Sequence, residues 1–391
     1  MNLDTRVWAA AAALGIGAAI AAAAPAWAEG TDGSATRTVS AGPVRSAKVA
    51  AVKAVSGRHR TGRSVTSPAL SVRPVALSPF SLSSRGTGAA ELSGITYAGG
   101  TTYYSVGDNG ATSIWQLYTS LASPPAGIRS GFVASGITAP ALGQDSEGIA
   151  LTPSGSSVWV SDEIDSTITE FSLSDGSKVG SVAVPAIYRP ANIQGNFGLE
   201  SLAYGAGALW TGNEEALRSD GALSSTAAGS WVRIQKFTGS DFAPATQYAY
   251  RTDPISALSP FTDAERSGLV DLVALPDGRM LSLERELGGF LPIFRSRLYS
   301  IDFTGATDVA AVPSLTDGSF TAVTKTLLWQ GYFAFANFEG ITLGPLRSDG
   351  SYSLLMVSDD GSGILGQRQT LLTLTLGLGL GLGLDGVTVS V

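Results

Sequence analysis

Residues 147–163 read EGIALTPSGSSVWVSDE, and this stretch carries the pattern from which the fold can be predicted. A short apolar run after Glu147 leads into a Pro-Ser-Gly-Ser turn, and a second apolar run ends at Asp162 and Glu163. Two β-rich runs joined by a glycine-containing turn are typical of a β-hairpin. Acidic residues therefore stand at both ends of the predicted hairpin.

The same layout recurs at 91–109, 200–215, 271–286 and 339–360. The five units begin 53 to 71 residues apart, which leaves room for two further strands in each unit. Candidate strands lie at 113–120, 167–174, 230–238 and 296–303, and residues 71–78 are a candidate for a missing outer strand of the last unit. This pattern predicts an all-β fold, a β-propeller of five or six four-stranded blades.

Hairpin geometry gives these acidic ends a common location. A hairpin reverses direction, so its two ends lie at the same edge of the sheet, and in a propeller this edge faces one mouth of the central channel. We expect the following acidic and amide residues to surround that mouth: Glu91, Asp108, Glu147, Asp162, Glu200, Asn213, Glu214, Asp271, Glu284, Glu339 and Asp359. An alternative is that single members cap strand ends by accepting hydrogen bonds from backbone N–H groups.

Composition limits the chemistry that this mouth could support. The chain has no cysteine, and its one histidine, His59, lies in a basic low-complexity segment. These facts exclude a cysteine nucleophile and make a Ser-His-Asp triad or a typical zinc site an unsuitable explanation. Crowded carboxylates with oxygen ligands alone favour Ca²⁺ or Mg²⁺, and we expect Asp108, Glu147, Asp162, Glu200, Glu284, Glu339 and Asp359 as metal ligands.

The chain is predicted to have four sections. Residues 1–28 resemble a secretory signal peptide, with an alanine-rich run and an Ala-Trp-Ala site before Glu29, so we expect a secreted or periplasmic protein. Residues 29–79 read as a basic disordered linker, 80–376 as the propeller and 377–391 as a low-complexity Gly/Leu tail. The tail is too short and glycine-rich for a stable membrane span.

Charge also bears on the partners. Residues 80–391 contain 16 Lys and Arg against 29 Asp and Glu, a balance near −13. A domain this acidic is a poor partner for nucleic acid, whose phosphates require basic side chains. We expect a small anionic substrate or ligand, bound with the help of a cation, and a monomeric protein.

Several strings resemble one known family. They are LSGITY (92–97), DSEGIAL (145–151), NFGLESLAY (196–204), LERE (283–286), RSRLYSID (295–302), NFEGITLGP (337–345) and LLMVSDD (354–360). In this order and spacing they are similar to phytase-like domains described as "esterase-like activity of phytase", over roughly residues 85–376. The resemblance implies a propeller in an exported protein with a hydrolase assignment.

Two functions are compatible with these observations. The first is a metal-dependent hydrolase of phosphoesters or esters, in which Glu147, Glu200 and Glu339 are ligands or the general base and Arg285 contacts the substrate anion. Arg285 could instead pair with a neighbouring carboxylate. The second function is a non-catalytic propeller that binds a ligand or a protein and contains a structural calcium site.

Overall fold

The computed structural model describes residues 69–79, 89–118, 133–256, 266–288, 293–362, 367 and 369–379. The expected signal peptide, residues 29–68 of the expected linker and most of the Gly/Leu tail lie outside these residues. Within the described residues, no helix is long and apolar enough to cross a membrane.

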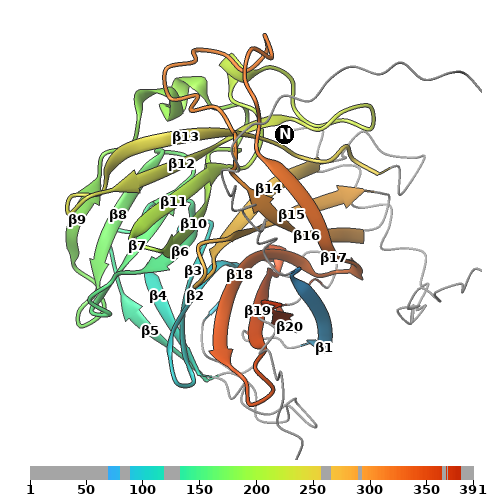
Figure 1. Ribbon diagram of the computed structural model, residues 1–391. Coiled ribbons are helices and arrows are strands. Elements are labelled where there is room, and N and C mark those ends of the chain that lie inside the picture. Colours follow the sequence, from blue (N-terminus) through green and yellow to red (C-terminus); the bar gives the residue numbers. More distant parts are fainter. Residues whose placement is uncertain are drawn as a thin grey trace, which may run out of the picture. The chain divides into compact units, whose positions relative to one another are not determined.

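Within the described ranges, twenty strands form five antiparallel sheets of four strands each, which Figure 1 shows arranged around a common centre. Blade 1 contains β2 (Leu92–Gly99), β3 (Thr102–Gly107), β4 (Ser113–Tyr118) and β5 (Val133–Thr138). Blade 2 contains β6 (Ser146–Leu151), β7 (Ser157–Asp162), β8 (Thr167–Ser172) and β9 (Lys178–Val182). Blade 3 contains β10 (Leu199–Gly205), β11 (Ala208–Asn213), β12 (Trp231–Thr238) and β13 (Ala243–Arg251).

Blade 4 contains β14 (Arg266–Ala274), β15 (Met280–Gly288), β16 (Ile293–Asp302) and β17 (Thr324–Ala334). Blade 5 contains β18 (Asn337–Leu346), β19 (Tyr352–Asp359), β20 (Thr370–Gly377) and, as its outer strand, β1 (Ser71–Pro79). In the described part of the chain, the short 3₁₀ helices η3 (Ala186–Tyr188) and η4 (Pro190–Asn192) lie between blades 2 and 3, and η5 (Arg218–Asp220) lies between β11 and β12 of blade 3. The number of blades is therefore five, within the predicted range of five or six.

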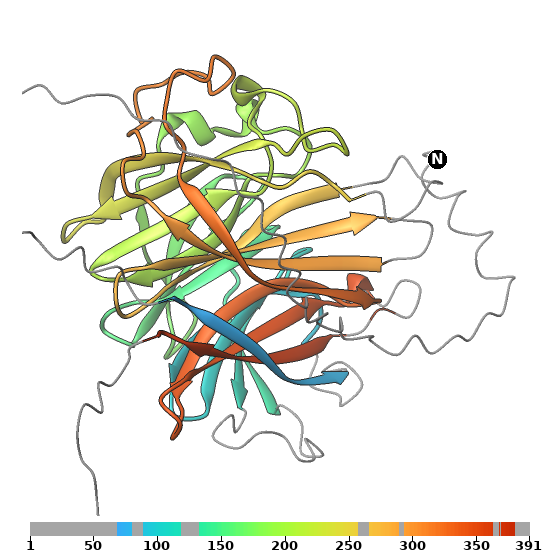
Figure 2. The ribbon, with the colours of Figure 1, turned by 45° about the vertical axis from the view of Figure 1, so that its right-hand side comes forward.

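The N-terminal strand closes the ring. β1 pairs antiparallel with β20, from Ser71 opposite Gly377 to Pro79 opposite Thr370. Figure 2 shows this blue strand beside the dark red end of the domain. The range 29–79, expected as a linker, thus ends in a strand, and the candidate outer strand at 71–78 is confirmed.

Each pair of neighbouring blades shares one apolar core. The five cores are centred on Tyr103 between blades 5 and 1, Val160 between blades 1 and 2, Trp159 between blades 2 and 3, Trp210 between blades 3 and 4, and Phe338 between blades 4 and 5. Val160 and Trp159 are adjacent in β7, so alternation along one strand supplies opposite faces of blade 2. This pattern explains why a repeated β-rich sequence packs radially.

The five inner strands, β2, β6, β10, β14 and β18, contact one another in cyclic order around the axis. Their middle residues line a cavity of about 280 Å³, bordered mainly by apolar side chains and three threonines. Between this cavity and the carboxylates the inner strands approach one another closely. A Cβ on Gly94 would lie 2.2 Å from the Glu147 carbonyl oxygen, and a Cβ on Gly340 would lie 2.2 Å from the Ser93 carbonyl oxygen. Glycine at these positions permits a narrow throat, and the carboxylates lie at the mouth end of it.

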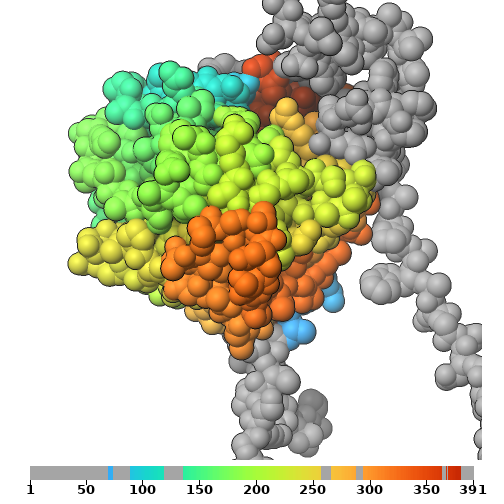
Figure 3. Space-filling view, turned by 90° about the horizontal axis from the view of Figure 1, so that it is seen from above, coloured from blue at the N-terminus to red at the C-terminus, as the bar shows by residue number. Residues whose placement is uncertain are grey.

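A strap of residues 303–323 connects β16 to β17 and lies along the outer edge of blade 3. Backbone N–H groups of Val309 and Val323 donate to the carbonyl oxygens of Gln247 and Ala249 in β13. In Figure 3 the orange residues of the strap abut the yellow residues of blade 3. The strap thus covers a sheet edge that would otherwise present unpaired backbone groups.

Candidate metal centre

Local strand geometry brings carboxylates from blades 1, 2, 3 and 5, and an arginine from blade 4, to one mouth of the channel. Each inner strand has a register irregularity near its start, for example between Ser146 and Ile149 in β6 and between Phe338 and Gly340 in β18. A β-bulge re-aims side chains and is frequent beside active sites. Glu147, Glu200 and Glu339 lie within these irregularities, and Ser93 and Val270 occupy the matching places in β2 and β14.

The second strand of each blade contributes one more position. In each second strand, one residue pairs with the inner-strand residue just before the bulge, and the next residues along the chain are Asp108, Glu163, Glu214, Arg285 and Asp359. The residues that face them across the hairpin include Glu91, Asp145 and Asn337. We call the nine carboxylates and the one arginine at these places the mouth cluster: Glu91, Asp108, Asp145, Glu147, Glu163, Glu200, Glu214, Arg285, Glu339 and Asp359.

Three carboxylate triplets within the mouth cluster have the spacing of a cation site. In each triplet, one oxygen from every residue lies within 4.8 Å of the others: Glu91, Asp108 and Asp359; Asp108, Asp145 and Glu147; and Glu147, Glu163 and Glu200. Asp108 and Glu147 each belong to two triplets. The triplets therefore form one continuous row of oxygen donors and not three separate sites.

Burial and mutual repulsion strongly perturb these groups. Burial, and then the charges of Asp359 and Glu339, raise the pKa of Asp108 to about 9. Burial, followed by the neighbouring carboxylates, raises the pKa of Glu147 and of Glu200 well above the ordinary value. The pKa of Asp359 is raised to about 7, first by burial and then by Glu339. Without a cation, several of these groups must hold protons at neutral pH.

Arg285 lies between two carboxylates on the other side of the mouth. One terminal nitrogen donates to Glu339 Oε1 at 2.9 Å and lies 3.2 Å from Glu214 Oε1. Asn337 Nδ2 also donates to Glu339 Oε1, at 2.7 Å. Burial raises the pKa of Glu214 to about 7, although Arg285 opposes this shift. The predicted alternative for Arg285, pairing with a carboxylate, is thus observed.

Several polar atoms in the mouth cluster have room for a further partner. Within the part of the chain that the structure describes, Asp108 Oδ1, Arg285 Nε and Asn337 Oδ1 are buried without a hydrogen bond. Arg285 is 8% exposed, and one terminal nitrogen makes both of its contacts with carboxylates. Its Nε therefore remains available for a further partner. Oxygen donors at this spacing fit a hard divalent cation such as Ca²⁺ or Mg²⁺, and the free Nε of Arg285 fits an anion.

Two expected ligands lie elsewhere. Asp162 precedes Glu163 and faces the opposite side of β7, where its oxygens accept hydrogen bonds from the backbone N–H groups of Asp145 (3.1 Å) and Asp165 (2.7 Å). Glu284 precedes Arg285 and faces blade 3, where it accepts a hydrogen bond from the Tyr250 hydroxyl at 2.6 Å and pairs with Lys325. Both residues are one position out of phase, because side chains alternate along a strand.

Two other members of the expected ring are structural. Asn213 Oδ1 accepts from the backbone N–H of Arg233 at 2.9 Å. Asp271 occupies the place that Gly94 and Gly340 hold in their strands, and its carboxylate accepts from the backbone N–H groups of Leu272 and Ile341 at 2.8 and 2.7 Å. Burial raises the pKa of Asp271 well above its ordinary value. This side chain therefore ties β14 to β18 in the throat.

The mouth cluster contains eight residues that the sequence predicts there: Glu91, Asp108, Glu147, Glu200, Glu214, Arg285, Glu339 and Asp359. Sequence reasoning missed Asp145 and Glu163 as members. Their signal was present, since Glu163 follows Asp162 directly and Asp145 begins the DSEGIAL string.

The fold and the mouth cluster define a five-bladed β-propeller with a carboxylate-lined mouth. The chain belongs to the Phytase-like family, described as "Esterase-like activity of phytase", whose model matches residues 87–361. No curated protein matches the chain.

The solved structures that the chain matches have low sequence identity to it. One is Kuenenia stuttgartiensis hydrazine synthase, with 12% identity and a TM-score of 0.31, and the match covers 70% of this chain and 59% of that one. Another is Myxococcus xanthus glutaminyl cyclase, with 12% identity and a TM-score of 0.36, and the match covers 80% of this chain and 100% of that one. A third is the PQQ-bound aldose sugar dehydrogenase of Streptomyces coelicolor, with 13% identity and a TM-score of 0.37, and the match covers 80% of this chain and 100% of that one. The chain thus spans less than two thirds of the length of the hydrazine synthase chain that it matches.

Proposed function

We propose that the protein is an exported hydrolase of phosphoesters or esters that depends on Ca²⁺ or Mg²⁺ held by the mouth cluster. The observation that carries this proposal is the row of three carboxylate triplets that share Asp108 and Glu147. An oxygen-only donor set favours hard cations, and buried carboxylates with raised pKa values gain most from a positive charge. Membership of the Phytase-like family supports the hydrolase assignment.

Different residues of the mouth cluster would have different roles in this reaction. Asp108, Glu147 and Glu200, with their triplet partners, would hold the cation, which when bound supplies positive charge that polarises a phosphoryl or carbonyl oxygen. Arg285 would orient the anionic part of the substrate through its unpartnered Nε. Glu339 accepts hydrogen bonds from Arg285 and Asn337 and is the proposed general base for water.

Charge makes the cation necessary in this scheme. The described propeller carries an excess of acidic residues, and nine of the ten members of the mouth cluster are carboxylates. A phosphate or carboxylate group would be repelled by this field unless protons or cations offset it. Cation binding is therefore expected to release protons from Asp359 and Glu214, whose pKa values are raised to about 7.

Turnover with and without metal tests the proposal. Release of product from p-nitrophenyl phosphate, phytate and p-nitrophenyl acetate is measured with Ca²⁺, with Mg²⁺ and with EDTA. We expect turnover of at least one substrate only with a cation, and its loss in Glu147→Gln, because Glu147 belongs to two triplets. Glu170→Gln is the matched control, since Glu170 lies on β8 of the same blade and accepts from the Ser157 hydroxyl.

Two outcomes would contradict the hydrolase proposal. Absence of turnover on all three substrates, together with a melting temperature that falls on chelation, would favour a binding propeller with a structural cation. Turnover that persists in EDTA and in Glu147→Gln would remove the cation from the mechanism. Isothermal titration of Ca²⁺ in buffers of different ionisation enthalpy measures the released protons separately from either activity.

Export and assembly are also part of the proposal. The Ala-Trp-Ala site predicts a mature chain that begins at Glu29 and is recovered outside the cytoplasm. N-terminal sequencing of the recovered protein checks this expectation, and an intact N-terminus in the cytoplasmic fraction would contradict it. Size-exclusion chromatography with light scattering is expected to give a monomer.

A further inference from the structure

A second cavity lies on the face of blade 2 that is turned toward blade 1. Its volume is about 570 Å³, which falls in the range of small-molecule sites. Five hydroxyl-bearing side chains line it: Ser146, Ser166, Thr167, Thr169 and Ser181. Leu142, Val160 and Phe171 also line it and belong to the apolar core between blades 1 and 2.

The strand register builds this wall. Ser146 lies opposite Asp162, which lies opposite Thr167, so one row crosses β6, β7 and β8. A second row crosses β7, β8 and β9 through Val160, Thr169 and Ser181. Cross-strand neighbours project from the same face of a sheet. The wall is therefore a regular surface of β-strands and not a chance arrangement of loops.

Two of the hydroxyls are buried without a partner. Ser146 is 1% exposed and Ser166 is 6% exposed, and the Oγ of each has no hydrogen bond to any residue that the structure describes. A buried hydroxyl without a partner is costly, and most such groups in proteins are satisfied. Because both residues line the cavity, a molecule inside it could satisfy them.

The charges around the cavity select against an ion. Both oxygens of Asp162 already accept backbone hydrogen bonds, from Asp145 and Asp165. The other charged lining residues are Asp165 and Lys178, which have opposite signs. Serine and threonine hydroxyls both donate and accept, so they match a ligand that itself carries hydroxyls. The apolar floor of Leu142, Val160 and Phe171 suits the C–H face of a sugar ring.

We propose that this cavity binds a neutral polyhydroxylated ligand, a sugar or sugar alcohol, at a site that does not depend on the mouth cluster. Ser146 precedes Glu147 in β6, so the two sites lie on opposite faces of one strand. The ligand is held by hydroxyl pairs along the two cross-strand rows, and Ser146 and Ser166 gain the partners that they lack.

Isothermal titration with glucose, maltose and myo-inositol as probes tests this inference, in EDTA to keep cations from the mouth cluster. We expect saturable binding of at least one probe, and about tenfold weaker binding in the double variant Thr169→Val/Ser181→Ala, which removes two ligand hydrogen bonds. Both positions are partly or fully exposed, so the fold is retained. Thr324→Val, at an exposed position on β17, is the matched control and should bind normally.

Three results would overturn the inference. The first is the absence of saturable binding for all three probes, which would assign the buried hydroxyls to water. The second is equal weakening in Glu147→Gln, which would place the probes at the mouth cluster. The third is tighter binding of glucose 6-phosphate than of glucose, which would contradict the charge argument. None of these results depends on hydrolase turnover.

Discussion

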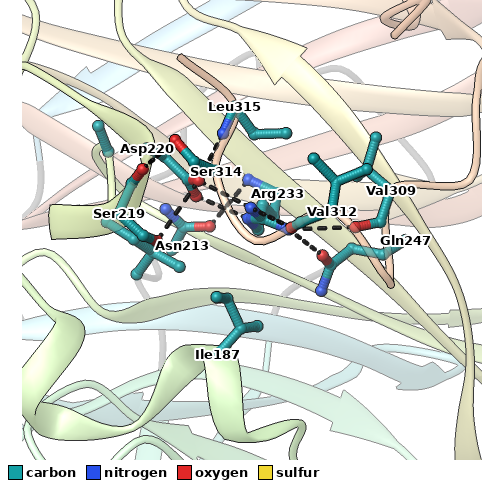
Figure 4. A network of polar contacts seen from close by, with 12 residues as sticks. Ile187, Asn213, Ser219, Asp220, Arg233, Gln247, Val309, Val312, Ser314 and Leu315 are labelled. Atoms are coloured by element: carbon teal, nitrogen blue, oxygen red, sulfur yellow. Dashed lines mark hydrogen bonds and ion pairs between the residues drawn. The ribbon is translucent and has the colours of Figure 1, made fainter. Parts of the chain in front are cut away.

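Replacement of Arg233 by leucine should severely destabilise the propeller. Arg233 lies on β12 with no exposed surface, and its Nε and one terminal nitrogen pair with the two carboxylate oxygens of Asp220 at 2.6 and 2.7 Å. Its remaining donors reach Gln247 Oε1 and the carbonyl oxygens of Val309 and Val312 in the strap (Figure 4). One side chain thus joins blade 3, its η5 connection and the strap of blade 4.

The magnitude follows from what the substitution leaves behind. Breaking a buried ion pair by removing one partner costs about 3–5 kcal/mol, because the other charge stays buried without compensation. Asp220 keeps two hydrogen bonds, from the Leu315 backbone N–H at 3.0 Å and from the Ser219 hydroxyl at 3.5 Å, which are too little to offset that charge. The carbonyl groups of Val309 and Val312 lose a charged donor as well. We therefore expect a loss of at least about 3 kcal/mol in the free energy of unfolding.

Urea denaturation followed by tryptophan fluorescence measures this loss. Arg251→Leu is the matched control, because Arg251 lies on the adjacent strand β13, is exposed and stacks 4.7 Å from the Trp231 ring. An exposed cation–π contact contributes about 0.5–1 kcal/mol, so the control should shift the midpoint only slightly. Limited proteolysis should cut the strap faster in Arg233→Leu. Equal stability of Arg233→Leu and Arg251→Leu would refute the reasoning.

Three other predictions concern the mouth and the throat. In the presence of a chelator, the pKa of Asp359 is raised to about 7 in the folded chain, above the ordinary value of about 4 that applies to the unfolded chain. The contribution of Asp359 to stability is therefore complete below pH ~4 and is lost as the pH rises through about 7. Thermal melting should show this fall and its removal by saturating Ca²⁺, whereas stability that rises with pH would contradict it. Gly94→Ala should lower the free energy of unfolding by about 1–3 kcal/mol through overpacking. Gly180→Ala, whose Cβ would lie 3.8 Å from Glu170 Oε2, should leave it unchanged in the same assay. Asp271→Leu should cost about 1–3 kcal/mol because the Ile341 N–H loses its acceptor, and a smaller effect than that of the nearly isosteric Asp271→Asn would disprove the role.

The fold was accessible from the sequence because local signals repeat in phase. The hairpins around 91–109 and 147–163 each combine β-rich runs with a glycine turn, and their spacing leaves room for β4 and β8. The closing strand β1 was only a candidate, since nothing local states that residues 71–79 pair with residues almost 300 positions later. That pairing depends on the closure of the ring.

The mouth cluster was accessible only in part. Glu147, Glu200 and Glu339 were correctly placed because each begins an inner strand. The sequence predicts Asp162 as a ligand, whereas the structure has its neighbour Glu163 at the mouth. It also predicts Glu284, whereas only its neighbour Arg285 lies there. The strand ends are predicted correctly, but the phase of the side-chain alternation is not. A bulge in the inner strand changes which residues of the two strands lie opposite one another, and its position depends on pairing with another strand.

The strap shows a different limit. Arg233 sits in the run SWVRIQKFT, which was recognised as a strand, and an arginine there reads as an exposed residue. Its burial requires Asp220 and the carbonyl groups of the strap, which come from two other parts of the chain. A single sequence contains no local signal that joins these parts.

Closure by β1 has a consequence for how the protein is made. During synthesis β1 emerges first, but the strand against which it pairs, β20, emerges last among the strands. The outer strand of blade 5 must therefore wait, without its partner, until the rest of the domain has been translated. Contacts between residues so far apart form slowly, since a long loop must be closed before they contribute. A chain interrupted anywhere before Thr370 would leave the circle open, so the ribosome must translate β20 before the propeller can close.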